Sequence, residues 1–160
     1  MSGRFDAESA MRFQHVSLSV VLFCSICAVG SAAETPLNAE KYPQETPQKA
    51  LASLVKCLDG KDYGYWISNL MTPLDGKGFL EKHGSLEKAV AFLSDDKRAK
   101  MMSDNKERMQ KMLDANKTTE GEDNGVKWVR FHLDEKELQL EKQIDGRWCM
   151  NTRVLGAKKQ

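Results

Sequence analysis

The sequence has little histidine and cysteine and almost no net charge, and these shortages narrow what the protein can do. It contains 3 histidines and 4 cysteines in 160 residues, and its formal charge is +1. Proteins that bind nucleic acids usually carry a marked basic patch, so the balanced charge argues against nucleic acid as a partner. Beyond residue 33, no two histidines or cysteines stand at the spacing of zinc ligands. The sequence therefore predicts no metal site and no cofactor, and it offers no catalytic constellation.

The first 33 residues are typical of a secretory signal peptide. From Val16 to Val29 the chain is uncharged and mostly apolar or small. This run is shorter than the roughly 20 residues that span a membrane, but it suits the apolar region of a signal peptide. Arg4 and Arg12 precede it, and small residues ending at Ala33 follow it. We therefore expect cleavage after Ala33 and export to the periplasm or the outside of the cell.

Two alternatives remain open for this segment. It could be retained as a membrane anchor, although it is short, and the chain could start at Met11 instead of Met1. After cleavage we expect no membrane span. The mature chain divides into a flexible leader at 34–45, which lacks periodicity, a single domain at 46–155 and a short tail at 156–160.

Apolar residues recur with helical spacing between residues 46 and 115, which predicts four helices. The predicted helices cover residues 47–58, 62–71, 85–93 and 97–115. Thr46-Pro47 is an N-cap followed by proline at the first helical position. Asp62 and Ser85 are the predicted caps of the second and third helices. The stretch 73–84 contains three glycines and is predicted to be a loop.

From residue 117 the apolar pattern alternates, which predicts β-strands. Strands are expected at 117–122, 126–133, 137–141 and 147–154. The intervening pairs Asn124-Gly125, Asp134-Glu135 and Asp145-Gly146 are turn signals. Helices followed by strands predict an α+β fold, in which N-terminal helices pack on one face of an antiparallel sheet of three to four strands.

One face of the predicted sheet is wholly apolar. It carries Val129, Phe131, Leu133, Leu138, Leu140, Trp148 and Met150. The opposite strand parity would instead bury Arg130, His132, Glu141 and Arg147, at a cost of several kcal/mol for each unpaired charge. We therefore expect the apolar face to point inward, either as a packed core or as the wall of a hydrophobic pocket.

Two short motifs accompany this order of elements: the turn Asp59-Gly60-Lys61-Asp62-Tyr63 after the first helix, and Gly146-Arg147-Trp148 in the last hairpin. With them the chain resembles the nuclear transport factor two-like superfamily over residues 46–154. That superfamily includes ketosteroid isomerase and SnoaL-type proteins and has a cone-shaped α+β fold. The resemblance implies a cone with a possible interior pocket, but members include enzymes, binding domains and exported proteins without an assigned role, so fold alone chooses no function.

Aromatic and sheet residues are the candidate pocket lining. They are Tyr63, Tyr65, Trp66, Phe131, Leu140, Trp148 and Met150. Aromatic rings with a polar tip suit the mouth of a ligand site. Tyr63 and Trp66 also fit a buried helical face without any ligand, and that simpler reading is favoured.

The histidines and methionines are the candidate metal ligands. His83, in a glycine-flanked stretch, and His132, on the predicted solvent side of a strand, are expected at the surface. Four methionines could bind Cu(I), because thioethers suit that ion. They are Met101, Met102, Met109 and Met112. Most of them share one helical stripe with Leu113, so packing in a core or an interface explains them better.

Cys57 and Cys149 are the two cysteines of the predicted mature domain. Export favours a disulfide between them. Alternation along the last strand argues the other way, because Cys149 must point away from the face that carries Trp148 and meets the first helix. The sequence leaves the pairing open.

Three functions remain in view at this point. The apolar inner face favours an exported, non-enzymatic domain that binds a small apolar ligand or a protein partner. The second possibility is an isomerase-, dehydratase- or hydrolase-type enzyme, as the resemblance implies. The third is a self-associating subunit, such as a homodimer formed through the outer face of the sheet, although the polar residues there suit contact with water.

Overall fold

Five α-helices precede a four-stranded antiparallel sheet in the computed structural model, which describes residues 40–154. The helices are α1 (Pro47–Asp59), α2 (Tyr63–Tyr65), α3 (Pro73–His83), α4 (Leu86–Ser94) and α5 (Asp96–Ala115), with a π-helix η1 (Trp66–Leu70) and a 3-10 turn η2 (Thr152–Val154). The strands are β1 (Thr118–Asp123), β2 (Val126–Leu133), β3 (Lys136–Lys142) and β4 (Trp148–Asn151), in the spatial order β1-β2-β3-β4. The predicted α+β class is confirmed. The predicted signal peptide, the first part of the leader and the tail lie outside the described residues.

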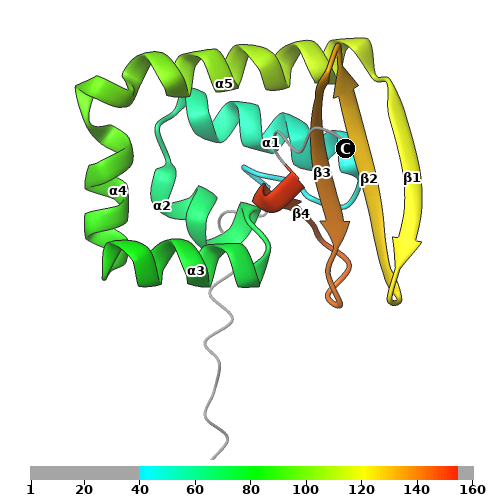
Figure 1. Ribbon diagram of the computed structural model, residues 1–160, viewed down its shortest axis with the longest axis horizontal. Helices are drawn as coiled ribbons and strands as arrows, with labels where there is room; N and C mark the ends of the chain where they lie inside the picture. The colour runs from blue at the N-terminus through cyan, green and yellow to red at the C-terminus, as the bar shows by residue number, and fades with distance from the viewer. Residues whose placement is uncertain (1–39, 155–160) are drawn as a thin grey trace, which may run out of the picture. The chain divides into compact units, whose positions relative to one another are not determined.

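The helices form a frame beside the sheet (Figure 1). In that view α5 runs along the top, α4 descends on the left, α3 runs along the bottom and the sheet stands on the right. Helix α1 lies behind the space between them and packs along α5, and α5 in turn contacts β2. In this view the frame has helices on three sides and the sheet on the fourth.

The helix N-termini repeat one capping device. The side chains of Thr46, Thr72, Ser85 and Asp95 each accept a hydrogen bond from a backbone N–H in the first turn of the following helix. The predicted loop at 73–84 is wrong, because Thr72 starts a helix in the same way and α3 extends over Pro73–His83. Thr72-Pro73 is a cap followed by proline, like Thr46-Pro47, and Gly84 ends the helix with φ +86°.

A close approach explains a glycine inside α3. A Cβ built on Gly76 would lie 2.8 Å from the carbonyl oxygen of Ile67, so any side chain there would push α3 away from η1. The second predicted helix also needs correction, because it is a single turn of α-helix followed by the π-helix η1. Asp62 stands at its N-cap, but the Asp62 side chain makes no capping hydrogen bond; its carboxylate accepts from Lys41 and Tyr42 instead.

The predicted strand parity is confirmed. The buried sheet residues on the inner face are Val129, Phe131, Leu138, Leu140, Trp148 and Met150, and Leu133 packs against them half-buried. Leu140 stands opposite both Val129 and Met150, so the apolar row runs across three strands. The last strand is shorter than predicted: β4 ends at Asn151, where the chain turns into η2 and leaves the sheet.

The outer edge of β4 is covered by two segments from far away in the sequence. Trp148 N–H donates to the Gln44 carbonyl at 3.0 Å, and Thr72 N–H donates to the Met150 carbonyl at 2.9 Å. Tyr42 and Gln44 are buried, so the packed region extends into the segment predicted as a leader. Within residues 40–154, no helix is long and apolar enough to cross a membrane.

Candidate functional site

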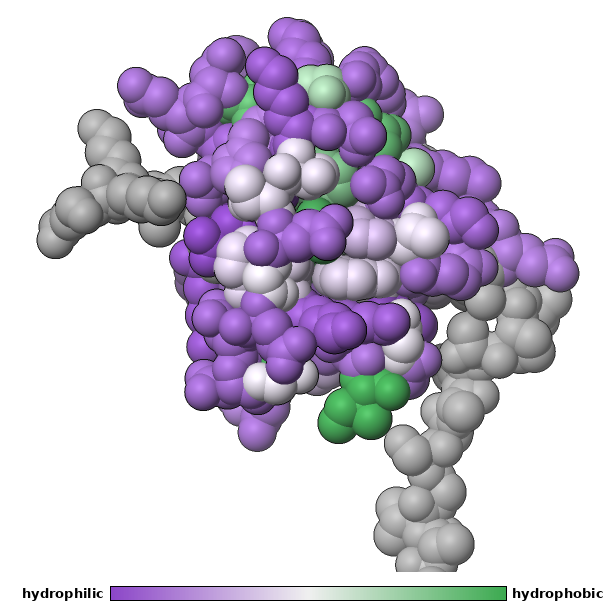
Figure 2. Space-filling view, turned by 90° about the vertical axis from the view of Figure 1, so that its right-hand side faces the viewer, coloured by the Kyte–Doolittle hydropathy of each residue, from purple (hydrophilic) through white to green (hydrophobic). Residues whose placement is uncertain are grey.

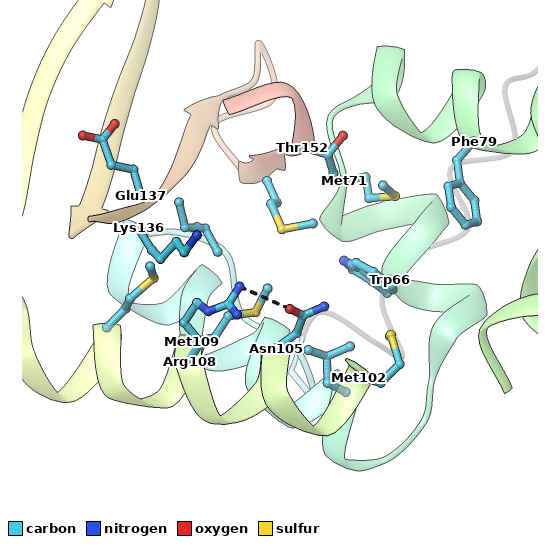
Figure 3. A pocket seen from close by; sticks show the side chains of 14 residues that line it. Trp66, Met71, Phe79, Met102, Asn105, Arg108, Met109, Lys136, Glu137 and Thr152 are labelled. Carbon is cyan, nitrogen blue, oxygen red and sulfur yellow. Dashed lines mark hydrogen bonds between the residues drawn. The ribbon is translucent and has the colours of Figure 1, made fainter. Parts of the chain in front are cut away.

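A cavity of about 360 Å³ lies between α5, η1, α3 and the β3–β4 side of the sheet (Figure 3). Its apolar lining comes from Leu58, Trp66, Met71, Phe79, Met102, Met109, Met112, Leu138 and Met150. The polar lining is Asn105, Arg108, Lys136, Glu137 and Thr152. The volume falls at the lower end of the range of about 300–1,000 Å³ that small-molecule sites occupy. Lys136 is exposed, so the cavity reaches the surface on its polar side.

Five methionines dominate the apolar wall, and the sequence brings them together from three places. Met102, Met109 and Met112 fall on one face of α5. Met71 follows η1 and pairs with Met150 through an isolated parallel bridge. Methionine is flexible and polarisable, so such a wall adapts to ligands of different shapes.

The π-helix η1 carries Trp66, one of the two aromatic side chains that line the cavity. Such helices are rare and occur often at functional sites. Trp66 opens η1, and its Nε1 is buried with no hydrogen-bond partner. In Figure 3 the indole nitrogen points into the cavity, on the side of Asn105. An indole N–H donates only, so Trp66 offers an unused donor to whatever occupies the space.

The charged lining is mainly cationic. Arg108 Nη1 donates to Asn105 Oδ1 at 3.4 Å, and no carboxylate among the described residues forms an ion pair with Arg108 or Lys136. The remaining charge is Glu137, whose Oε1 lies 3.5 Å from Nδ1 of its cross-strand neighbour His132. Figure 3 shows the Glu137 carboxylate turned away from the cavity, whereas Arg108 and Lys136 point toward it.

A buried carboxylate fixes the wall that Thr152 contributes. Asp75 Oδ2 accepts hydrogen bonds from Thr72 Oγ1 at 2.8 Å and from Thr152 N–H at 2.9 Å, and Asp75 Oδ1 lies 3.2 Å from Arg153 Nε. Asp75 stands in the first turn of α3, where the helix dipole favours negative charge. It therefore fastens the end of β4 to α3 and closes one side of the cavity.

The residues proposed from the sequence as pocket lining are distributed between the cavity and the core. Trp66 and Met150 line the cavity. Tyr63, Phe131, Leu140 and Trp148 are buried in the core. Tyr65 stacks on Tyr42 with 4.6 Å between ring centroids. Sequence reasoning did not single out Met71, Phe79, Asn105, Arg108 or Lys136; the positions of Asn105 and Arg108 beside the methionine stripe of α5 were the available signal.

His83 and His132 are more buried than predicted, because both side chains are only partly exposed. His83 is wedged between the rings of Phe79 and Phe92, at centroid distances of 4.5 and 4.2 Å, and its Nε2 is buried without a partner. His132 is half-buried on the outer face of the sheet, where its Nε2 lies 2.9 Å from Thr119 Oγ1. Within the part of the chain that the structure describes, no three His, Cys, Asp or Glu side chains are grouped to hold a metal ion.

Cys57 and Cys149 are both free and buried. Cys57 Sγ donates to the Asp62 carbonyl at 3.0 Å, and Cys149 Sγ donates to the Asn69 carbonyl at 3.5 Å. Burial raises the pKa of Cys57 to about 12 and that of Cys149 to about 11. Since the thiolate is the nucleophile, these pKa values leave both thiols unreactive at neutral pH.

The outer face of the sheet is polar. Arg130 Nε donates to Gln139 Oε1 at 2.7 Å, and Gln139 Nε2 donates to Glu141 Oε1 at 2.8 Å. The Arg130 guanidinium also lies 4.4 Å from the Trp128 ring. Figure 2, which views the side on which β1 and β2 lie, shows a mostly hydrophilic surface. This side therefore suits contact with water better than an apolar interface.

Comparison of the chain with protein-family models, with curated proteins and with solved structures found no match. The resemblance to the nuclear transport factor two-like superfamily therefore stays a prediction from sequence. The function proposed below rests on the geometry of the cavity.

Proposed function

We propose that this domain binds a small, mainly apolar ligand in the cavity between α5, η1 and the sheet. The observation that carries the proposal is a space of about 360 Å³ whose walls are methionine, tryptophan, phenylalanine and leucine, with a few polar side chains at one side. This combination of apolar walls and sparse polar groups is the usual composition of small-molecule sites. With the predicted signal peptide, the role is that of an exported binding protein.

Binding fits the cavity better than catalysis of the isomerase type. Such an enzyme places an acid or base within hydrogen-bond reach of its substrate. The carboxylate in the cavity lining belongs to Glu137, which is directed toward His132 and away from the space. Arg108 and Lys136 are basic side chains, which suit holding a ligand.

A neutral, environment-sensitive dye such as Nile red tests the proposal. We expect saturable fluorescence enhancement with one dye per chain. Met102→Trp places a larger side chain in the cavity and should weaken dye binding at least tenfold. Met101→Trp is the matched control, because the neighbouring Met101 is 46 % exposed and outside the lining. Both variants are compared by thermal melting, so that a loss of binding is separated from a loss of fold.

Two results would count against the proposal. One is unsaturable dye binding by the folded parent protein. The other is equal dye affinity in parent and Met102→Trp when both melt cooperatively, because the space would then not be the binding site.

A further inference from the structure

We infer that the ligand is an anionic amphiphile, with its negatively charged group held by Arg108 and Lys136 and its apolar part held by the methionine wall. This inference rests on the proposed function and names the chemical class of the ligand. It follows from three features of the cavity: the sign of its charges, the direction of its hydrogen-bonding groups and their position at one side.

The first feature is uncompensated positive charge. Arg108 is half-buried on the cavity face of α5, and among the described residues its polar contact is the Asn105 amide oxygen. Lys136 starts β3 on the same sheet face as Leu138. By contrast, Lys100, Lys106 and Lys111 on the same helix each lie within 3.0 Å of a carboxylate oxygen. A half-buried guanidinium without a carboxylate partner is stabilised by a ligand that supplies one.

The second feature is an excess of hydrogen-bond donors. Trp66 Nε1–H is buried and unpartnered, and it can only donate. Arg108 and Lys136 donate as well. Asn105 Oδ1 accepts one hydrogen bond from Arg108, and the amide NH₂ of Asn105 adds two further donors. A ligand whose polar end accepts hydrogen bonds satisfies these groups, whereas a cationic or purely donating ligand does not.

The third feature is the separation of polar and apolar walls. Figure 3 shows Arg108 and Lys136 on one side of the cavity, with Met71 and Phe79 on the other. An amphiphile would therefore lie with its anionic group at the exposed, Lys136 side and its chain directed toward Phe79. The flexible methionines between them tolerate chains of different shapes.

Three probes with one alkyl chain and different head groups test the inference. Decanoate, 1-decanol and decylammonium are each used to displace Nile red from the full protein at neutral pH and low ionic strength. We expect decanoate to displace the dye at a concentration about tenfold lower than decanol, since one charge-assisted contact of about 1.4 kcal/mol changes affinity tenfold. Decylammonium should be the weakest competitor.

Charge variants locate the effect. In Arg108→Gln and in Lys136→Gln, the preference for decanoate over decanol should fall several-fold relative to the parent. Lys111→Gln is the matched control: it removes one positive charge from the exposed face of α5, outside the lining, and should keep the preference. Thermal melting of each variant shows whether the fold is intact, and the decanol value serves as the reference for the preference.

The outcomes separate the two proposals. Equal competition by decanoate and decanol in the parent would overturn the inference while leaving apolar ligand binding in place. A decanoate preference that is the same in Arg108→Gln, Lys136→Gln and Lys111→Gln would also overturn it, because the charge recognition would lie elsewhere. If the dye itself does not bind, the proposed function fails first.

Discussion

Replacing Gly121 by alanine tests how β1 and β2 hold together. Gly121 stands opposite Trp128 in the sheet, and a Cβ built on Gly121 would lie 2.2 Å from Cζ2 of the Trp128 ring. The indole thus folds over the glycine of the neighbouring strand, a known way for an aromatic ring to compensate a strand glycine. Arg130 lies over the same ring. Gly121→Ala must therefore displace Trp128 from its position between strand and guanidinium.

The expected change in the free energy of unfolding combines unfavourable and favourable contributions. Overpacking of a well-filled position costs about 1–3 kcal/mol, and displacing the ring also weakens a cation–π contact of about 0.5–1 kcal/mol. Glycine in a strand is itself unfavourable by about 0.5–1 kcal/mol relative to alanine, which offsets part of that cost. We expect Gly121→Ala to lower the free energy of unfolding by about 1–2 kcal/mol. In a Trp128→Ala background the clash is gone, so the same change should raise the free energy of unfolding by about 0.5 kcal/mol.

Urea denaturation of the four proteins of this double-mutant cycle measures the coupling directly. With a slope of about 1–3 kcal/mol/M, the expected loss moves the midpoint of the parent by roughly 1 M. Gly78→Ala is the control, because a Cβ at Gly78 in α3 meets nothing within 4 Å. It should stabilise the protein by about 1 kcal/mol in both backgrounds. If Gly121→Ala destabilises both backgrounds equally, Trp128 is not the cause and the reasoning is refuted.

Three further changes probe the core, the buried carboxylate and the thiols. Trp148→Ala should lower the free energy of unfolding by about 3–5 kcal/mol, since Trp148 is only 8 % exposed; a melting temperature like that of the parent would refute its burial. Asp75→Asn should cost about 1.5–3 kcal/mol in urea denaturation through its weakened bonds to Thr152 and Arg153, whereas Asp104→Asn on the exposed side of α5 should change little; equal effects would contradict the tie between α3 and β4. Burial raises the pKa of Cys57 from its ordinary 9.0 to about 12, so the unfolded state loses its proton first and stability should fall as the pH rises from 9 to 12. Cys57→Ala should show a smaller loss over that interval, and identical pH profiles would exclude this thiol as a cause.

Elements with local signals could be predicted from the sequence. Thr46 and Ser85 begin helices where expected, because an N-cap acts on backbone groups within three residues. Asn124-Gly125 makes the predicted turn, with both residues at positive φ. The strand parity was also predictable, since reversing it would bury several charges. The helix caps and the turn depend on residues that are close in the sequence. The strand parity depends only on which of the two faces of the sheet is apolar.

Helix α3 could not be predicted in the same way, because its stability depends on distant contacts. Its glycines lower helix propensity, and a proline after Thr72 is as typical of the end of one helix as of the start of the next. In the structure the same pair also starts the next helix, and Gly76 allows α3 to approach the Ile67 carbonyl. Packing therefore offsets the low propensity, which is a long-range effect that a local pattern does not contain.

The sequence predicts only part of the cavity lining. The other lining residues depend on contacts between segments that are far apart in the sequence. Alternation along the strands identifies inward-facing residues without distinguishing those that fill the core, such as Phe131, from those that border a space, such as Met150. That distinction depends on how far α5 stands from the sheet. The sequence shows the methionine stripe of α5, but its partners are Met71, which follows η1, and Phe79 in α3, and these segments have little regular periodicity.

The methionine walls give a reason to regard the space as a site and not as a packing defect. The space opens to the surface beside Lys136, so water that enters it meets thioether and aromatic walls. Contact of apolar surface with water costs roughly 25 cal/mol per Å². Met102, Met109 and Met112 have enough rotatable bonds to fold into the space, and they border it instead. A ligand that fills the apolar part and accepts hydrogen bonds from Trp66 and Arg108 would offset both costs at once, which is why the charge of the ligand and the shape of the cavity belong to one argument.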